Sequence, residues 1–176
     1  AVRLFRQAAE GEHAAAETWL AYLNYHGAGG LSQDYREAVK WARLGADHGD
    51  PEAQTMLGEM YAEGHGVAKN DTVAVKLFRQ AANAGWADAQ CWMGVMAHKG
   101  RGVPKDPHEA VRWWRLAADN GDDEALYNLG YAYEAGVGVA RDISESIGWY
   151  RRAAERKNSK NYQAAVDALR RLGALR

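Results

Sequence analysis

The chain has 176 residues, with 22 Lys and Arg against 23 Asp and Glu, so its formal net charge is −1. This balance gives no basic surface for nucleic acid, and no apolar run is long enough to cross a membrane. The single cysteine, Cys91, excludes an internal disulfide, and with six scattered histidines it cannot complete a zinc site. We therefore expect no nucleic-acid partner, no direct membrane insertion, no metal and no cofactor.

The glycines recur with a fixed period along the chain, which is typical of a repeat protein. Gly64, Gly100 and Gly136 are spaced 36 residues apart. The same step relates Gly66, Gly102 and Gly138; Ala53, Ala89 and Ala125; and Gly58, Gly94 and Gly130. We therefore divide the chain by this period.

Residues 1–13 correspond to the end of a repeat. The segment 4–9 reads LFRQAA, and the segment 77–82 reads the same. We interpret 1–13 as the tail of a truncated repeat and expect at least one further helix upstream.

Residues 14–49, 50–85, 86–121 and 122–157 each predict a pair of helices. In 50–85, Ala53, Leu57 and Tyr61 lie at i, i+4 and i+8, and Gly64 then suits a left-handed helix end. The second helices are predicted to begin after the N-caps Asp34, Asn70, Asp106 and Asp142.

Small and bulky residues indicate how these helices pack. We expect Gly58 to face Ala74, and Gly94 to face Ala110, at close helix crossings. Trp41, Trp113, Trp114 and Trp149 are predicted to be core residues of the second helices, whereas Trp19, Trp86 and Trp92 are predicted to be partly exposed.

Residues 158–176 lack the loop motif and predict a C-terminal capping helix over 160–173. Ala165, Val166, Leu169 and Leu172 would face inward. A lone hairpin cannot bury its apolar face, so we expect one all-α domain, 1–176, of stacked helical hairpins.

The motifs of the third hairpin carry a resemblance to a known family. The segments AQCWMG at 89–94, GRGVPKD at 100–106 and AVRWWRLAA at 110–118 resemble a Sel1-like repeat, a relative of the tetratricopeptide repeat. The resemblance implies a right-handed α-α superhelix whose first helices line a concave groove. It also implies an adaptor for a protein or peptide partner, in a bacterial envelope, signalling or secretion context that points to a periplasmic or secreted location and leaves a cytoplasmic one open. We expect the chain to be a monomer.

The groove positions of the tetratricopeptide relatives can be carried over to the first helices of this chain. The variable residues at these positions include several tyrosines, typical of interface hot spots, and several glutamates, which favour a basic partner. The partner-binding candidates are Thr18, Tyr22, Tyr25, His26, Glu52, Thr55, Glu59, Glu63, Asp88, His98, Lys99, Tyr127, Tyr131 and Glu134.

We expect no catalytic residues and no enzyme activity. The Gly-x-Gly loops follow a helix and lack the Lys-Ser/Thr ending of a phosphate-binding loop. Two alternatives to the adaptor function stay open. One is a dedicated inhibitor or immunity protein for one effector. The other is a weak penicillin-directed hydrolase, as described for cysteine-rich relatives, in which Glu59, Glu63, His98 and Lys99 would supply acid and base.

Overall fold

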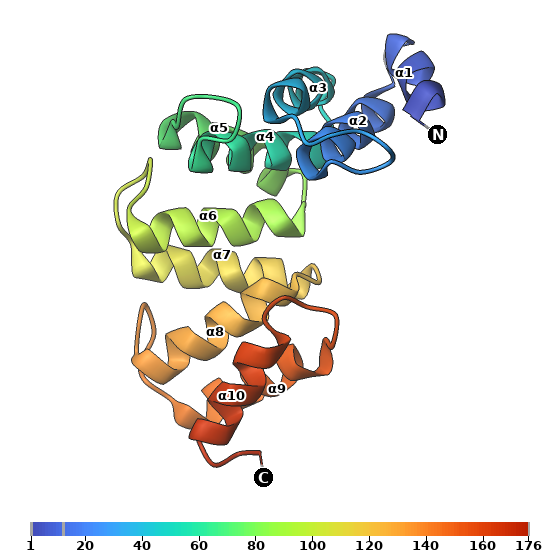
Figure 1. Cartoon of the computed structure of the whole chain (residues 1–176). Helices are drawn as coiled ribbons and strands as arrows, with labels where there is room; N and C mark the ends of the chain where they lie inside the picture. Colours follow the sequence, from blue (N-terminus) through green and yellow to red (C-terminus); the bar gives the residue numbers. More distant parts are fainter. Residues whose placement is uncertain (1, 12, 176) are drawn as a thin grey trace. The chain divides into compact units, whose positions relative to one another are not determined.

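The computed structural model describes residues 2–11 and 13–175, which form ten α-helices and no strand (Figure 1). The helices are α1 (Val2–Glu10), α2 (Ala14–His26), α3 (Tyr35–Asp47), α4 (Pro51–Glu63), α5 (Asp71–Asn83), α6 (Ala87–Lys99), α7 (Pro107–Asp119), α8 (Asp123–Ala135), α9 (Ile143–Glu155) and α10 (Tyr162–Arg171). They pack as sequential hairpins, which confirms the predicted all-α repeat fold.

The helices are grouped into two compact units. Ala1–Ala89 contains α1 to α5 and the start of α6, and Gln90–Arg176 contains the remainder. In the first unit the hairpins α2/α3 and α4/α5 pack against each other through α3 and α4, and α1 covers α2. In the second unit α7 packs on α8, α8 on α9, and α10 on α9.

The predicted helix ends are confirmed. Gly64 ends α4 with φ +80, and its N–H donates to the carbonyl of Met60. The side chain of Asp106 accepts a hydrogen bond from Glu109 N at the start of α7, and Asp142 does the same for Glu145 N at the start of α9. These caps satisfy backbone groups that a helix leaves without partners.

The second loop glycine of a hairpin is needed for contact with the preceding hairpin. A Cβ at Gly66 would collide with the carbonyl group of Tyr35, at the start of α3. Gly138 has the same relation to Pro107, at the start of α7. Both glycines have positive φ, so two physical constraints require glycine at this repeat position.

The helix crossings differ from our expectation. The atoms closest to a Cβ at Gly58 belong to the ring of Phe78, not to Ala74, and those closest to a Cβ at Gly94 belong to Trp114, not to Ala110. Gly130 faces Tyr150 in the same way. An aromatic ring on the second helix therefore fills the space that the glycine leaves on the first.

This arrangement divides the aromatic residues of the second helices into two classes. Phe78, Trp114 and Tyr150 share one repeat position and are fully buried. Trp41, Trp113 and Trp149, one position earlier, are only half-buried, so the prediction of a core role holds for Trp114 but is too strong for these three. Trp19 is exposed and Trp86 and Trp92 are half-buried, as predicted.

The C-terminal helix α10 lies close to its predicted range. Ala165, Val166 and Leu169 are buried, as expected, while Leu172 is half-buried just past the helix end. Ala165, Leu169 and Ala168 join the hydrophobic core that is formed with α7, α8 and α9.

Candidate functional site

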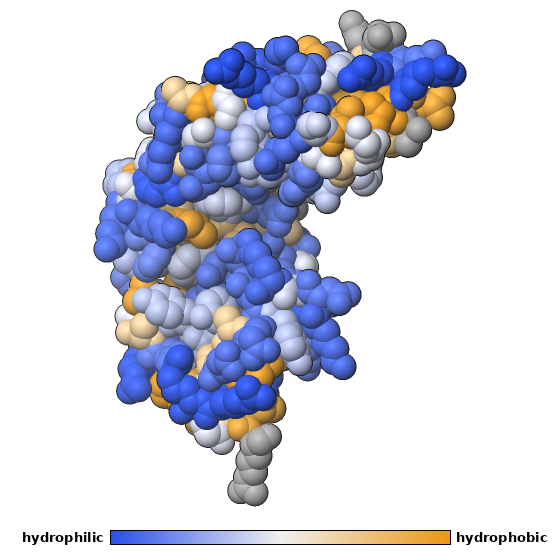
Figure 2. Space-filling view, in the orientation of Figure 1, coloured by the Kyte–Doolittle hydropathy of each residue, from blue (hydrophilic) through white to orange (hydrophobic). Residues whose placement is uncertain are grey.

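The exposed face of α2 carries two large aromatic side chains. Trp19 is 53% exposed and Tyr22 is 41% exposed. Trp19 stacks on Phe5 of α1, with ring centroids 6.1 Å apart, and meets Tyr22 edge-on at 5.7 Å. Tyr22 in turn contacts His26 at 4.4 Å. We call these four residues the aromatic strip. Figure 2 shows hydrophobic surface gathered where α1 meets α2.

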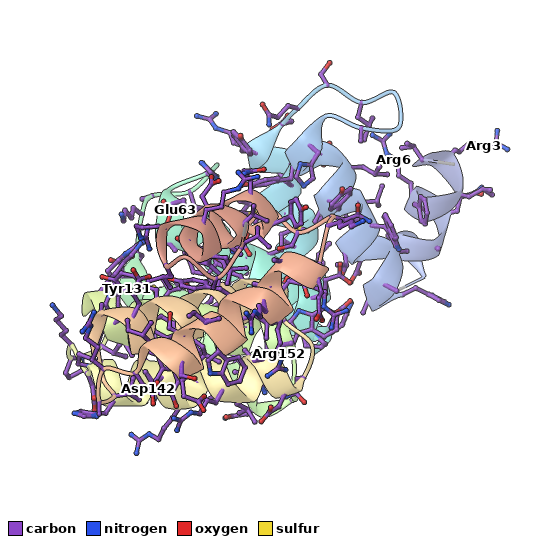
Figure 3. The ribbon with its side chains drawn as sticks, turned by 90° about the horizontal axis from the view of Figure 1, so that it is seen from below. Arg3, Arg6, Glu63, Tyr131, Asp142 and Arg152 are labelled. Carbon is purple, nitrogen blue, oxygen red and sulfur yellow. The ribbon has the colours of Figure 1, made fainter. Side chains whose placement is uncertain are left out.

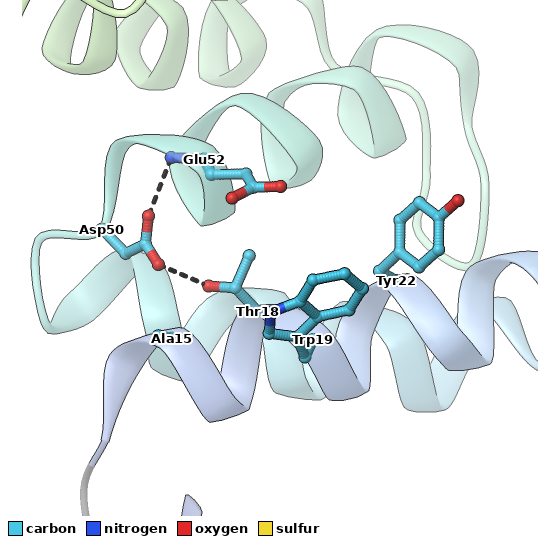
Figure 4. Close-up of a pocket in the computed structure, with 6 residues that line it drawn as sticks. All are labelled: Ala15, Thr18, Trp19, Tyr22, Asp50 and Glu52. Atoms are coloured by element: carbon cyan, nitrogen blue, oxygen red, sulfur yellow. Dashed lines mark hydrogen bonds between the residues drawn. The ribbon is translucent and has the colours of Figure 1, made fainter. Parts of the chain in front are cut away.

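A pocket of about 240 Å³ opens beside this strip, between α2 and the start of α4 (Figure 4). Aromatic side chains form one side and carboxylates the other. The residues that line it are Ala15, Thr18, Trp19, Tyr22, Asp50 and Glu52.

The floor of the pocket is held by hydrogen bonds. The Thr18 hydroxyl donates to Asp50 Oδ2 over 2.7 Å and lies 3.0 Å from the carbonyl oxygen of Ala14. Asp50 Oδ1 accepts the backbone N–H of Glu52 as the N-cap of α4. The N-cap of α4 is thereby hydrogen-bonded to α2, which fixes the carboxylate of Asp50 in place.

Gly45 allows this close approach. A Cβ at Gly45 would lie 2.8 Å from the Cβ of Ala53 and 3.0 Å from the hydroxyl of Thr18. The glycine of α3 thus lets α2 and α4 meet under the pocket.

The electrostatics of the pocket are uniformly negative. Among the described residues that line it, Asp50 and Glu52 are acidic and none is basic. Partial burial, and then the charges of Asp50 and Asp88, raise the pKa of Glu52 above its ordinary value. Arg3 and Arg6 project from α1 and are exposed (Figure 3).

The opposite end of α2 forms a second aromatic group at the loops. The Tyr25 hydroxyl and His65 Nδ1 form a hydrogen bond of 2.8 Å, and Tyr35 stacks on His65 with ring centroids 4.8 Å apart. Burial, and then the nearby charge of Glu59, raise the pKa of Tyr25. Tyr25 thus links the end of α2 to the loop that follows α4.

In the second unit, Tyr131 and His98 form a separate contact. Tyr131 is 43% exposed and meets His98 edge-on at 6.3 Å, and the His98 ring lies 5.6 Å from that of Trp114. Burial, followed by the positive charges of Lys105 and Lys99, lowers the pKa of His98. This shift favours the neutral imidazole.

The carboxylate of Glu134 makes hydrogen bonds within the protein that the sequence did not indicate. Its carboxylate accepts the Tyr150 hydroxyl at 2.8 Å, and both of its oxygens accept Arg171 of α10, at 2.7 and 2.8 Å. Burial and the bond to Glu134 raise the pKa of Tyr150. Tyr127 packs on the same tyrosine at 5.5 Å. Glu134 therefore fastens the capping helix.

The structure separates the predicted binding residues into accessible and engaged groups. Thr18 and Thr55 are buried, and Thr55 bonds back to the carbonyl of Pro51, so neither presents a side chain to a partner. With Glu134 they are corrected to structural roles. The other candidates are exposed or half-buried, although Tyr25, His98 and Tyr127 make the contacts described above: Tyr22, Tyr25, His26, Glu52, Glu59, Glu63, Asp88, His98, Lys99, Tyr127 and Tyr131. Of these, Tyr22 and Glu52 meet in the pocket.

Three pocket residues, Ala15, Trp19 and Asp50, are absent from the predicted binding set. Trp19 shares its repeat position with the half-buried Met56 and Trp92, which suggests packing rather than binding. Asp50 falls at a turn between hairpins, and Ala15 carries no chemical signal. Trp19 and Asp50 lie in different hairpins, so no local sequence pattern brings them together.

The described residues offer neither a metal site nor a membrane span. Within 2–11 and 13–175, no three His, Cys, Asp or Glu side chains are placed to hold a metal ion. No helix in that part of the chain is sufficiently long and apolar to span a bilayer.

The helical repeats match a known family of proteins. The Sel1 repeat family matches residues 1–13, 14–50, 51–86, 87–122 and 123–158. No curated protein matches the chain significantly.

Several solved structures are similar. A Sel1 repeat protein from Oxalobacter formigenes is 32% identical over 98% of this chain and 71% of its own, with a TM-score of 0.85. A protective antigen of uropathogenic Escherichia coli with the same fold is 37% identical over 90% of this chain, with a TM-score of 0.81. The match covers 34% of the antigen, so this chain spans about a third of that protein.

An immunity protein from Pseudomonas aeruginosa shares the fold at 23% identity, over 94% of this chain and 59% of its own, with a TM-score of 0.63. The family match extends over nearly the whole chain, from residue 1 to residue 158. The chain therefore belongs to the Sel1 repeat family of tetratricopeptide-like helical repeat proteins.

Proposed function

We propose that this Sel1 repeat chain is a protein-interaction module that binds a segment of a partner protein on the α2–α4 face of its first unit. The observation that carries the proposal is the pocket between Trp19, Tyr22, Asp50 and Glu52. Large aromatic side chains exposed beside fixed carboxylates are typical of interface hot spots, because they bury much area with little loss of side-chain entropy.

The pocket geometry favours binding over catalysis. The Thr18 hydroxyl is buried and donates to Asp50, and the described lining residues include no histidine, lysine or cysteine. A nucleophile needs an adjacent base that can take its proton and access to a substrate. We therefore propose that the chain acts without turnover. The likeness to the immunity protein concerns the fold, and a dedicated inhibitor is a special case of the same binding function.

The test is selection of peptides from a random displayed library on the immobilised chain. We expect enriched peptides whose binding is lost with Tyr22→Ala. The matched control is Leu44→Ala, because Leu44 is 44% exposed in the same unit but lies on the second helix α3. Binding that survives Tyr22→Ala and is lost with Leu44→Ala would move the interface to the other face of the hairpin. No enrichment over a blank surface would contradict the proposal.

A further inference from the structure

We propose that the α2–α4 pocket is an arginine-binding site, which receives one guanidinium group from the partner segment. This inference rests on the proposed interaction function and names the side chain that the pocket selects. Three features of the pocket support it: its charge, the geometry of its aromatic side and its fixed floor.

Among the described residues, 2–11 and 13–175, no basic side chain forms an ion pair with the carboxylates of the pocket. Asp50 and Glu52 contribute two carboxylates, and Asp88 adds a third negative charge nearby. Asp50 is held by Thr18 and by the backbone of α4, whereas no side chain within 2–11 and 13–175 bonds to the Glu52 carboxylate. In Figure 4 this carboxylate points into the space above Thr18 and Trp19. An incoming cation would relieve the repulsion among these groups and is therefore the complementary ligand.

The aromatic side of the pocket favours a planar cation. Phe5 stacks on Trp19 with an interplanar angle of 22°, and Tyr22 stands at 74° to the Trp19 ring. A guanidinium group can stack on an aromatic face while its N–H groups point at a carboxylate in the same plane. An ammonium group is more strongly hydrated and has no flat face, so it contacts the aromatic ring less well.

The size and rigidity of the site also fit an anchored side chain. The cavity is about 240 Å³, which accommodates one long side chain and not a folded element. The Thr18–Asp50 bond and the N-cap of α4 hold the floor before any ligand binds. Such pre-organisation reduces the entropy lost on binding.

The experiment uses N-acetyl-arginine methylamide as the probe and follows the indole N–H signal of Trp19 by NMR, identified by its loss in Trp19→Phe. The charge control is the citrulline analogue, which has nearly the same shape and no charge. The geometry control is the lysine analogue. We expect a saturable shift with arginine in the millimolar range, at least about tenfold weaker binding of citrulline, and intermediate binding of lysine.

Variants locate the interaction. Glu52→Gln removes one charge without changing shape, and we expect about threefold to tenfold weaker arginine binding. Tyr22→Ala should weaken it by a similar factor. Leu44→Ala should leave it unchanged, since this residue lies on α3. All three residues are exposed, and the backbone amide spectrum of each variant reports whether the fold is retained.

Three results would overturn the arginine site. They are equal affinity for arginine and citrulline, shifts that are insensitive to Glu52→Gln, or shifts that depend on protein concentration without ligand, which would assign the pocket to a second copy. Failure of this inference differs from failure of the proposed function. Library peptides that need Tyr22 but contain no arginine would leave the interaction module standing and remove only the arginine site.

Discussion

The replacement of Gly130 by alanine tests how the hairpins are held together. Gly130 is buried in the middle of α8, and a Cβ there would lie 2.5 Å from Cδ1 and 2.6 Å from Cε1 of Tyr150. A contact this short does not occur for a real Cβ, so either the ring or the helix must shift. The ring has little freedom, because it is 1% exposed and its hydroxyl is bound by Glu134.

The expected cost of this substitution follows from two opposing effects. Alanine in a helix interior is favoured over glycine by about 0.8–1 kcal/mol. Overpacking a tight core costs about 1–3 kcal/mol, and the fixed ring of Tyr150 places this site toward the upper end of that range. We therefore expect Gly130→Ala to lower the free energy of unfolding by about 1–2 kcal/mol in net terms.

Gly148→Ala is the matched control. Gly148 lies in the interior of α9 and is exposed, and a Cβ at this position would meet no atom within 4 Å. Only the difference in helix propensity applies there, so we expect stabilisation by about 0.8–1 kcal/mol. The two substitutions are chemically identical and should shift stability in opposite directions.

Calorimetry and denaturant unfolding measure the stability of both variants. For a chain of this size, each kcal/mol is expected to shift Tm by about 2–4 °C. The substitution is then repeated in a Tyr150→Leu background, where the ring that blocks the Cβ is gone. We expect Gly130→Ala to become neutral or stabilising there. An unchanged cost in that background, or wild-type stability of Gly130→Ala alone, would show that the ring of Tyr150 does not set the cost.

Three further outcomes are expected. Glu134→Ala should lower the unfolding free energy by about 1 kcal/mol through the lost bond to Tyr150, and hydrogen exchange should show the loss of protection concentrated in α10. Gly66→Ala should cost about 1–3 kcal/mol, more than Gly85→Ala, because both have positive φ but only the first collides with backbone; thermal unfolding compares them. Burial raises the folded-state pKa of Glu52 above 4.5, so its ionisation disfavours folding as the pH rises above that value. Relative to wild type, Glu52→Gln should therefore gain stability as the pH is raised, and identical pH profiles would contradict the raised pKa.

Much of the fold is predictable because the repeat requires the same backbone conformation in every hairpin. Gly64 is recognisable as a helix end because a left-handed cap favours glycine, and the structure gives it φ +80. Asp106 and Asp142 are recognisable as caps because short acidic side chains satisfy the first N–H groups of a helix. These are local constraints, which act within a few residues of sequence.

The side chains that meet at the helix crossings are harder to predict from the sequence. The sequence predicts that Gly58 opposes Ala74, and the structure places the ring of Phe78 there instead. Spacing along a helix identifies the face that packs, but the depth to which each side chain enters depends on the rotation of two helices about their axes. Trp113 and Trp114 are neighbours in sequence, and only Trp114 is fully buried.

The candidate site shows the same division. Tyr22 and Glu52 are predicted from the sequence as variable residues of the first helices, since packing demands repetition and recognition does not. Glu134 satisfies the same criterion, yet it binds Tyr150 and Arg171, a residue 37 positions further along the chain.

The hairpin repeat, its caps and its loop glycines can be read from the amino-acid sequence, because they depend on backbone conformation and on contacts between near neighbours. Which carboxylates are engaged and which stay accessible depends on the three-dimensional packing. Glu134 and Glu52 are equivalent in residue type and in their assignment to first helices, but one accepts a hydroxyl and a guanidinium from other helices, and the other faces an aromatic pocket. That difference arises from side chains brought together over long sequence distances, which no local pattern records.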